Sequence, residues 1–330
     1  MGRLLRWLGF LVFFIIIGVS GVGFWSYTEF VRSGPLAAEK IIVIPRGEGI
    51  ERIAILLARH NVIKIPLVLS IAARTVATDK ALQAGEFTFP KAASPRDVLK
   101  VLKTGKQVVR RLTVAEGLTS AEILDRLKKT EGLAGGVTVT VREGQLLPET
   151  YYFTFGDTRN TLVKRMQGGM QKALAILWPR RSPNLPLATQ EEAVILASIV
   201  EKETGRAAER ARVAGVFINR LRLNMRLQSD PTVAYGLHQG HQELRRALTR
   251  KDLKTPSPFN TYLNKGLPPG PIANPGRASL EAVLHPADTG ELYFVADGSG
   301  GHAFARSLAE HNHNVAKWRK LEKTQKPNQP

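Results

Sequence analysis

The chain has 330 residues, with 47 Lys and Arg against 28 Asp and Glu, a formal net charge of +19 and a hydrophobic fraction of 43%. This composition excludes a disordered chain, a collagen-like chain and a multi-span membrane protein, and the length suffices for two modest domains. The absence of Cys excludes a disulfide scaffold, a Cys-ligated metal site and thiol catalysis. The positive charge favours polyanionic neighbours, either nucleic acid or the anionic surface of a membrane and its wall.

An uncharged apolar segment lies near the N-terminus, at 7–28. A helix of this length, rising about 1.5 Å per residue, crosses a ~30 Å hydrocarbon core. Trp7 stands at one end and Trp25 and Tyr27 at the other, where aromatic rings prefer the membrane interface. We therefore predict that residues 1–28 form a short cytoplasmic start and a single transmembrane anchor.

The charges around this segment predict its orientation. Arg3 and Arg6 precede it, so the positive-inside rule leaves residues 30–330 outside the cytoplasm. A cleaved signal peptide is the alternative, but its apolar region would be shorter and 20–23 is a poor cleavage site. The sequence predicts a single-pass protein of the inner (cytoplasmic) membrane. The membrane and the wall are its expected partners, and no nucleic-acid binding is predicted.

Two similar patterns follow the anchor, each a short strand, a turn and an amphipathic helix. Their strands are expected at 41–44 and 112–114, each followed by a helix. The second halves also match, since Phe87–Phe89 followed by 98–102 resembles Phe153–Phe155 followed by 162–166. The simplest interpretation is two related α+β modules, at 29–105 with the linker and at 106–185. Coincidence is the alternative, since such patterns are common. Neither module contains a recognisable set of catalytic or metal-binding residues.

Three prolines between 179 and 186 mark a boundary, after which we predict the catalytic domain at 186–320 and a polar tail at 321–330. Thr189 is a candidate N-cap for a helix whose residues 193–200 are apolar almost throughout. Such a helix should be buried.

The buried helix runs directly into Glu201-Lys202-Glu203. A carboxylate at the end of a buried helix is desolvated, which favours its protonated form, as a general acid requires. Glu201 shares a helix face with the small residues Ala197 and Ser198 and could therefore face a cleft. A solvated helix end is the plainer interpretation, because charges after an apolar run are usually on the surface.

The remaining segments predict ordered loops and a hairpin. Turns are expected at 226–232 and 257–262, and irregular Pro- and Gly-rich backbone at 266–276. Amides, hydroxyls and aromatic rings on stiff loops suit binding of a sugar chain, although ordinary turns would have the same composition. A strand at 292–296, a turn at 297–301 and a helix from Ser307 complete the chain.

Three histidines, His302, His311 and His313, raise the question of a metal. Their spacing does not match a zinc-binding helix, and a His-x-His pair is a weak signal. The nucleophile elbow of serine hydrolases and the Walker and Rossmann fingerprints are missing as well. No metal and no cofactor is predicted.

Several motifs, in order and with compatible spacing, together resemble the YceG-like family, the endolytic murein transglycosylases of bacteria. They lie at 195–204, 216–221, 227–233, 260–262, 266–272 and 293–298, with an upstream match at 147–151. Each motif is weak by itself, whereas the ordered set is specific. The resemblance covers residues 40–315.

The resemblance implies a membrane-anchored lytic transglycosylase acting on nascent peptidoglycan. Such an enzyme cuts the β-1,4 bond between N-acetylmuramic acid and N-acetylglucosamine within a strand, leaves a 1,6-anhydro end and so terminates strand elongation. The family's catalytic glutamate falls on Glu201, whereas periodicity does not separate Glu201 from Glu203. The motifs also supply candidate substrate-binding residues, namely Glu149, Gln228, Ser229, Asp230, Asn260, Thr261 and Tyr262.

The implied fold is α+β, with a single transmembrane helix, a small LysM-like module at about 40–105 and a mixed α+β catalytic domain. One glutamate suffices for the implied reaction, because the C6 hydroxyl of the muramic acid replaces water as the nucleophile. A muramidase that uses water, with Asp230 or Glu203 as second carboxylate, is one alternative. A non-catalytic wall-binding scaffold is another. Peptidoglycan strands are the expected ligand, and peptidoglycan synthases are candidate partners.

Overall fold

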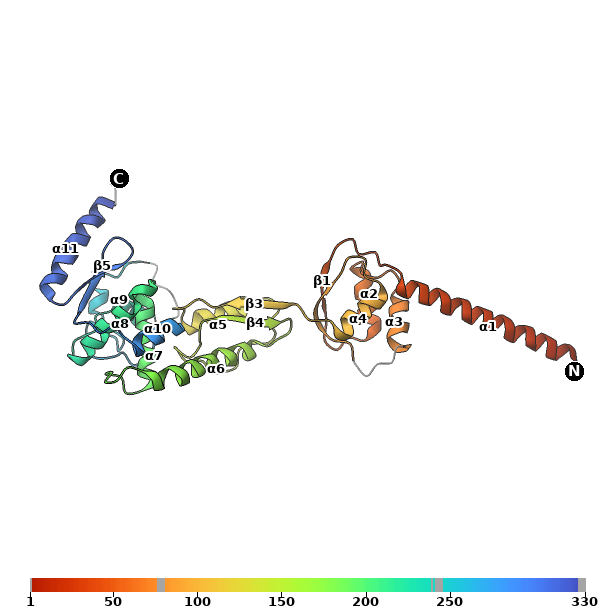
Figure 1. Cartoon of the computed structure of the whole chain (residues 1–330), viewed down its shortest axis with the longest axis horizontal. Helices are drawn as coiled ribbons and strands as arrows, with labels where there is room; N and C mark the ends of the chain where they lie inside the picture. The colour runs from red at the N-terminus through yellow and green to blue at the C-terminus, as the bar shows by residue number, and fades with distance from the viewer. Residues whose placement is uncertain (1, 76–80, 239, 241–245, 326–330) are drawn as a thin grey trace. The chain divides into compact units, whose positions relative to one another are not determined.

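The computed structural model describes residues 2–75, 81–238, 240 and 246–325 (Figure 1). It combines helices with short strands, which confirms the predicted α+β class. The chain divides into two compact units. The first comprises Met1–Arg110 and Tyr152–Gly156, and the second comprises Arg111–Tyr151 and Asp157–Pro330. The module boundaries predicted at 105 and 185 stay predictions.

Helix α1, Gly2–Val31, contains the predicted anchor. Its segment Arg6–Val31 is long and apolar enough to cross a membrane, and none of its most apolar stretch is buried by the rest of the chain. Trp7 is 75% exposed and Phe14 66% exposed, which is unfavourable in water and suits a hydrocarbon environment. The helix is therefore consistent with a single-pass anchor. At its far end Phe30 packs against the core of the first unit.

The first unit is a two-stranded sheet covered by three helices. The elements are β1 (Lys40–Ile44), α2 (Ile50–Arg59), α3 (Pro66–Thr75), β2 (Gly85–Phe89) and α4 (Pro95–Thr104). The strands are antiparallel, and Ile42 lies opposite Phe87. Phe87 and Phe89 are fully buried against the helices because alternate strand residues face one side of a sheet. The strand predicted at 41–44 and the helix after it are confirmed.

The predicted second pattern follows the first along the chain. It consists of β3 (Val109–Thr113), α5 (Ser120–Lys129), β4 (Thr150–Thr154) and α6 (Arg159–Leu177), and β3 pairs with β4. Helix α5 starts with a capping box, in which the Thr119 hydroxyl accepts from the Glu122 amide and the Glu122 carboxylate accepts from the Thr119 amide. Glu116 lies in the loop between β3 and α5.

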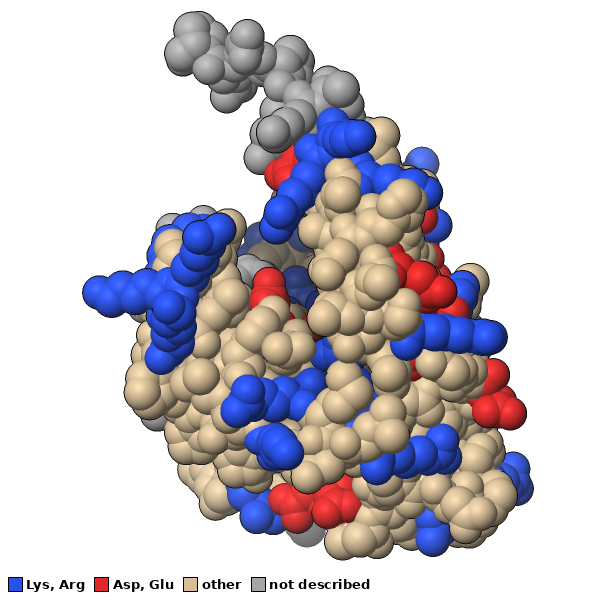
Figure 2. Space-filling view, turned by 90° about the vertical axis from the view of Figure 1, so that its left-hand side faces the viewer, with Lys and Arg blue, Asp and Glu red and all other residues tan. Residues whose placement is uncertain are grey.

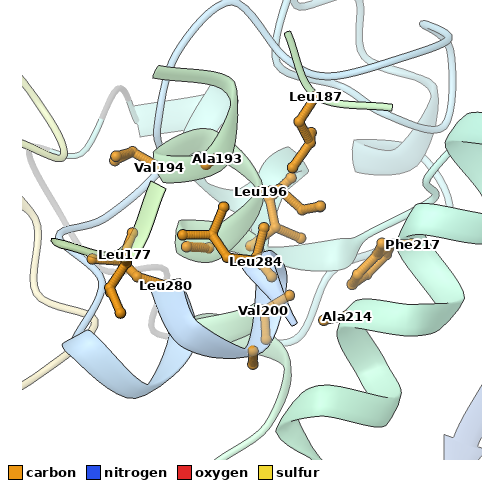
Figure 3. Close-up of a cluster of buried hydrophobic side chains, with 14 of the residues drawn as sticks. Leu177, Leu187, Ala193, Val194, Leu196, Val200, Ala214, Phe217, Leu280 and Leu284 are labelled. Atoms are coloured by element: carbon orange, nitrogen blue, oxygen red, sulfur yellow. The ribbon is translucent and has the colours of Figure 1, made fainter. Parts of the chain in front are cut away.

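The core of the second unit forms where α7 (Gln190–Glu203), α8 (Ala207–Arg222) and α10 (Arg277–Leu284) meet (Figure 3). The segment 193–200 is buried in full, as its composition predicts. Leu196, Val200, Phe217 and Leu284 converge between the helices, and burial of each large side chain contributes about 1.5–3 kcal/mol. Helix α7 is thereby fixed on all sides, and so is the direction in which its last turn points.

Helix α9, Asp230–His238, corrects one prediction. The sequence predicts a turn over 226–232, but the helix already begins at Asp230. Asp and Pro are turn residues, yet they also favour the first turn of a helix, where the missing amide hydrogen of Pro231 is not needed. The turn at 257–262 and the irregular segment 266–276 are confirmed. Two short 3-10 helices, η1 (Trp178–Arg180) and η2 (Asp252–Lys254), lie elsewhere in the chain.

The chain ends in a hairpin and a helix. Strands β5 (Tyr293–Ala296) and β6 (His302–Ala305) pair antiparallel around the predicted turn, in which the Asp297 carboxylate accepts from the Ser299 amide at 2.7 Å. Helix α11 spans Leu308–Gln325, so the polar tail predicted from residue 321 is helical in its first part. On the left-hand face of the molecule Lys and Arg are widely spread, with Asp and Glu in smaller groups between them (Figure 2).

Candidate active site

The last turn of α7 carries both candidate glutamates. The Thr189 hydroxyl accepts from the Glu192 amide at 3.2 Å and fixes the start of the helix, and Thr204 caps its end. Residues two apart on an α-helix differ by about 200° around its axis. Glu201 and Glu203 therefore point to opposite sides of α7 and meet different neighbours.

Glu201, the predicted catalytic residue, faces the start of α10. Its side chain is only 6% exposed, and its Oε2 accepts from the Gly276 amide at 2.8 Å. The Arg210 guanidinium lies 3.7 Å from Oε1. A helix N-terminus and a cation both stabilise negative charge. Glu201 is therefore engaged by two electropositive neighbours, the Gly276 amide and the Arg210 guanidinium.

Glu116 lies near Arg210 together with Glu201, and the sequence analysis missed it. Its Oε2 lies 4.0 Å from the Arg210 guanidinium. Burial and the neighbouring charge of Glu201 raise the pKa of Glu116. A methyl group at Gly276 would lie 1.8 Å from the Glu116 carboxylate, so the Glu116 side chain would have to move to admit it. No local motif connects positions 116 and 201, because the fold alone brings them together.

Glu203 faces the other side, where predicted polar residues gather. The Ser229 hydroxyl donates to its Oε1. Burial raises the pKa of Glu203 to about 7, the charge of Asp230 adds to the rise, and the hydrogen bond from Ser229 and the charges of His302 and Arg220 oppose it. This carboxyl is therefore protonated in part of the molecules at neutral pH, as general-acid catalysis requires.

Asp230 and Tyr262 form a second pair beside Glu203. The Tyr262 hydroxyl donates to Asp230 Oδ1 at 2.6 Å. Burial, followed by the hydrogen bond to Asp230, raises the pKa of Tyr262, so the phenol stays protonated and keeps donating. Of the predicted residues, Ser229, Asp230 and Tyr262 thus surround Glu203 and not Glu201.

The other predicted residues have different surroundings. Asn260 is fully buried, where its amide donates to the carbonyls of Leu253 and Thr255 at 3.1 and 2.8 Å and so shapes the turn. Thr261 is also buried, and its hydroxyl accepts from the Ser229 amide at 3.0 Å. Both residues therefore position the loops that carry Ser229 and Tyr262.

Gln228 and Glu149 are exposed. Gln228 takes a left-handed backbone conformation, with φ of 49°, next to Ser229, and its amide donates to the Thr261 carbonyl at 3.1 Å. Glu149 precedes β4, where its carbonyl accepts from the Val114 amide at 3.0 Å. In the part of the chain that the structure describes, Glu149 does not line the cleft described below.

His302 and Glu209 form a pair that the sequence did not predict. His302 Nδ1 lies 2.7 Å from Glu209 Oε2, and its amide donates to Glu209 Oε1 at 3.1 Å. The ring of His311 instead stacks on Tyr293, with 5.1 Å between the ring centres. The histidines therefore have separate partners.

A cleft of about 300 Å³ opens next to this site in the second unit. Asp230 lines it and thereby connects it to Tyr262 and Glu203. The other lining residues include Thr119, Glu122, Lys202, Tyr235, Arg246 and Ile272. With two acidic and two basic side chains, the lining is close to neutral and suits an uncharged, hydroxyl-rich ligand.

Comparison with known proteins gives consistent results. The chain is 31% identical over 305 residues to the endolytic murein transglycosylase of Bacillus subtilis (strain 168), covering 82% of each chain. It is 29% identical to the endolytic murein transglycosylase of Streptococcus pneumoniae (strain ATCC BAA-255 / R6), covering 94% of this chain and 64% of that protein. A solved structure, a putative YceG-like protein from Listeria monocytogenes, matches with a TM-score of 0.51 and 30% identity over 84% of this chain and 99% of that one. The profile of the YceG-like family matches residues 42–317, so the chain belongs to the YceG-like family.

Proposed function

We propose that this chain is an endolytic lytic transglycosylase that cuts the β-1,4 bond between N-acetylmuramic acid and N-acetylglucosamine within nascent peptidoglycan strands. Membership of the YceG-like family and the names of its relatives support this class of enzyme. The observation that carries the chemistry is the Glu203 carboxyl, whose pKa burial raises to about 7 beside a near-neutral cleft.

Protonated Glu203 acts as the general acid. It donates its proton to the glycosidic oxygen as the bond from that oxygen to the muramic acid C1 breaks, which leaves positive charge on the sugar ring. The Glu203 carboxylate then accepts the proton of the C6 hydroxyl while that oxygen bonds to C1. The products are a free 4-hydroxyl on N-acetylglucosamine and a 1,6-anhydro ring, and no water is consumed.

The neighbours of Glu203 have distinct roles in this scheme. Ser229 orients the carboxyl, since its hydroxyl donates to Oε1. The Asp230 carboxylate, held by Tyr262, stabilises the positive charge on the ring. The resemblance assigns the acid to Glu201, whereas the geometry favours Glu203, because Ser229, Asp230 and Tyr262 surround Glu203. Glu201 is instead engaged by Arg210 and the Gly276 amide.

Helix α1 places this activity at the membrane. Arg3 and Arg6 lie on the cytoplasmic side, and residues 30–330 lie outside the cytoplasm, where nascent glycan is found. The first unit corresponds to the predicted LysM-like module and contributes to glycan binding. Peptidoglycan synthases remain candidate partners.

Asp230 also favours a second candidate, a muramidase in which two carboxylates act with water. The products separate the two reactions. We expect mass spectrometry of strands cut by the purified chain to show ends lighter by one water than reducing ends. Reducing ends alone would identify a muramidase, and intact strands would leave a non-catalytic wall-binding scaffold.

A further inference from the structure

A second and larger cleft lies in the same unit. It has a volume of about 620 Å³ and shares one lining residue, Tyr235, with the cleft beside Asp230. Tyr235 and Phe259 form an aromatic pair at this junction, with ring centres 4.9 Å apart. A ligand longer than one cleft can therefore continue over Tyr235 into the other.

Tyr235 of this pair is anchored by Glu143. The Tyr235 hydroxyl lies 3.4 Å from Glu143 Oε2. Glu143 Oε1 accepts from the Ser120 amide at 2.7 Å and from the Asn274 side chain at 2.9 Å. Both rings remain partly exposed. A fixed and partly exposed aromatic surface is suited to stacking against the apolar face of a sugar ring.

The chemistry of the lining points to a glycan. Four glutamines line the larger cleft, Gln145, Gln167, Gln171 and Gln190, together with apolar side chains. Amides can donate to and accept from hydroxyl and acetamido groups. The charged lining residues are Arg142, Glu143 and Glu191, an excess of one negative charge in a chain of net charge +19. Peptide stems carry free carboxylates, which this lining does not complement. The sugars of a stem-bearing strand are uncharged, because the lactyl carboxyl of muramic acid is amide-linked to the stem.

We propose that this larger cleft binds the sugars of the glycan strand beyond those at the cut, so that the two clefts form one extended binding groove. The proposal rests on the proposed function, since an enzyme that cuts within a strand must hold sugars on both sides of the bond. Binding of remote sugars improves positioning at the reacting bond. The groove therefore makes cleavage depend on strand length.

The test compares two substitutions on α6. Gln171→Trp fills the cleft, and Lys172→Trp places the same side chain on the neighbouring exposed residue, which does not line it. With the full chain in detergent, we expect Gln171→Trp to raise KM for long strands about tenfold, equivalent to one lost stacking or hydrogen-bonding contact. Cleavage of four-sugar fragments should stay within about twofold of the parent chain. Lys172→Trp should change neither value.

Equal KM values on long strands for Gln171→Trp and Lys172→Trp would overturn the proposal, as would equal losses on long and short substrates. If the Gln171→Trp effect disappears on strands whose peptide stems have been removed, the cleft binds peptide and the proposal is wrong. A binding measurement tests the groove even if the proposed cleavage chemistry is wrong. In the Glu203→Gln chain, Gln171→Trp should weaken binding of stem-free long strands about tenfold, whether or not the parent chain cleaves them.

Discussion

Glu201 and Glu203 lie two residues apart on α7 and accept hydrogen bonds on opposite sides of it, Glu201 Oε2 from the Gly276 amide at 2.8 Å and Glu203 Oε1 from the Ser229 hydroxyl. On the first side, Arg210 and the start of α10 stabilise negative charge. On the second, burial favours the neutral carboxyl. One helix end therefore carries two carboxylates with different chemical properties.

The first prediction concerns pH. Because burial raises the pKa of Glu203 to about 7, the acid form declines as pH rises through this value. We expect kcat/KM for glycan cleavage to fall about tenfold for each pH unit well above 7, when measured from pH 5 to 9. A rate that keeps rising to pH 9 would show that an ionised carboxylate performs the first step.

A second prediction uses Ser229. Its hydroxyl stabilises the Glu203 carboxylate and thereby lowers the pKa of that group. In Ser229→Ala the alkaline fall in kcat/KM should therefore move to higher pH, by about half a unit to one unit. Ser182→Ala, at a partly buried serine outside the site, is the control and should leave the profile unchanged. A shift to lower pH would contradict the assignment.

A third prediction concerns packing at Gly276. A methyl group there would lie 1.8 Å from the Glu116 carboxylate and must displace it from Arg210. Because Glu116 is flexible and 45% exposed, we expect Gly276→Ala to lower the free energy of unfolding by no more than about 1 kcal/mol in denaturant titrations. Gly136→Ala, where nothing lies within 4 Å, should have little effect.

The double variant identifies the cause. Because Glu116→Ala removes the clashing side chain, adding it to Gly276→Ala should recover most of the loss. Additive losses in the double variant would show that the two residues act independently.

A fourth prediction concerns α1. Its apolar stretch is unburied, whereas Phe30 packs on the core of the first unit. Removal of residues 1–28 should move the protein from the membrane to the soluble fraction without changing the thermal unfolding of the first unit. Removal of residues 1–31 should lower the unfolding temperature by several degrees, because the Phe30 contacts are lost. Equal unfolding temperatures would contradict the packing of Phe30.

Local patterns predict most of the helices and strands. Thr189 and the apolar run 193–200 predict α7, and the β-branched run 41–44 predicts β1. The misassigned start of α9 has a local cause as well, since Asp230 and Pro231 favour both a turn and a helix start. Helix α11 continues past residue 320 because polar Lys, Glu and Gln are good helix formers.

The site could be predicted only in part. The motifs indicate Ser229, Asp230 and Tyr262, which do gather around one carboxyl. Which glutamate they surround depends on the rotation of α7, and the core between α8 and α10 sets this rotation. Glu116 was missed because tertiary packing alone brings it to Arg210.

The most direct test compares Glu203→Gln with Glu201→Gln in the full chain, with release of glycan fragments as the readout. Gln preserves the size of the side chain but cannot transfer the proton. We expect Glu203→Gln to lower kcat by about 10²–10⁴-fold with the fold intact, and Glu201→Gln to cleave with a rate within about tenfold of the parent chain. Full cleavage by Glu203→Gln together with an inactive, folded Glu201→Gln would contradict the assignment and return the catalytic role to Glu201.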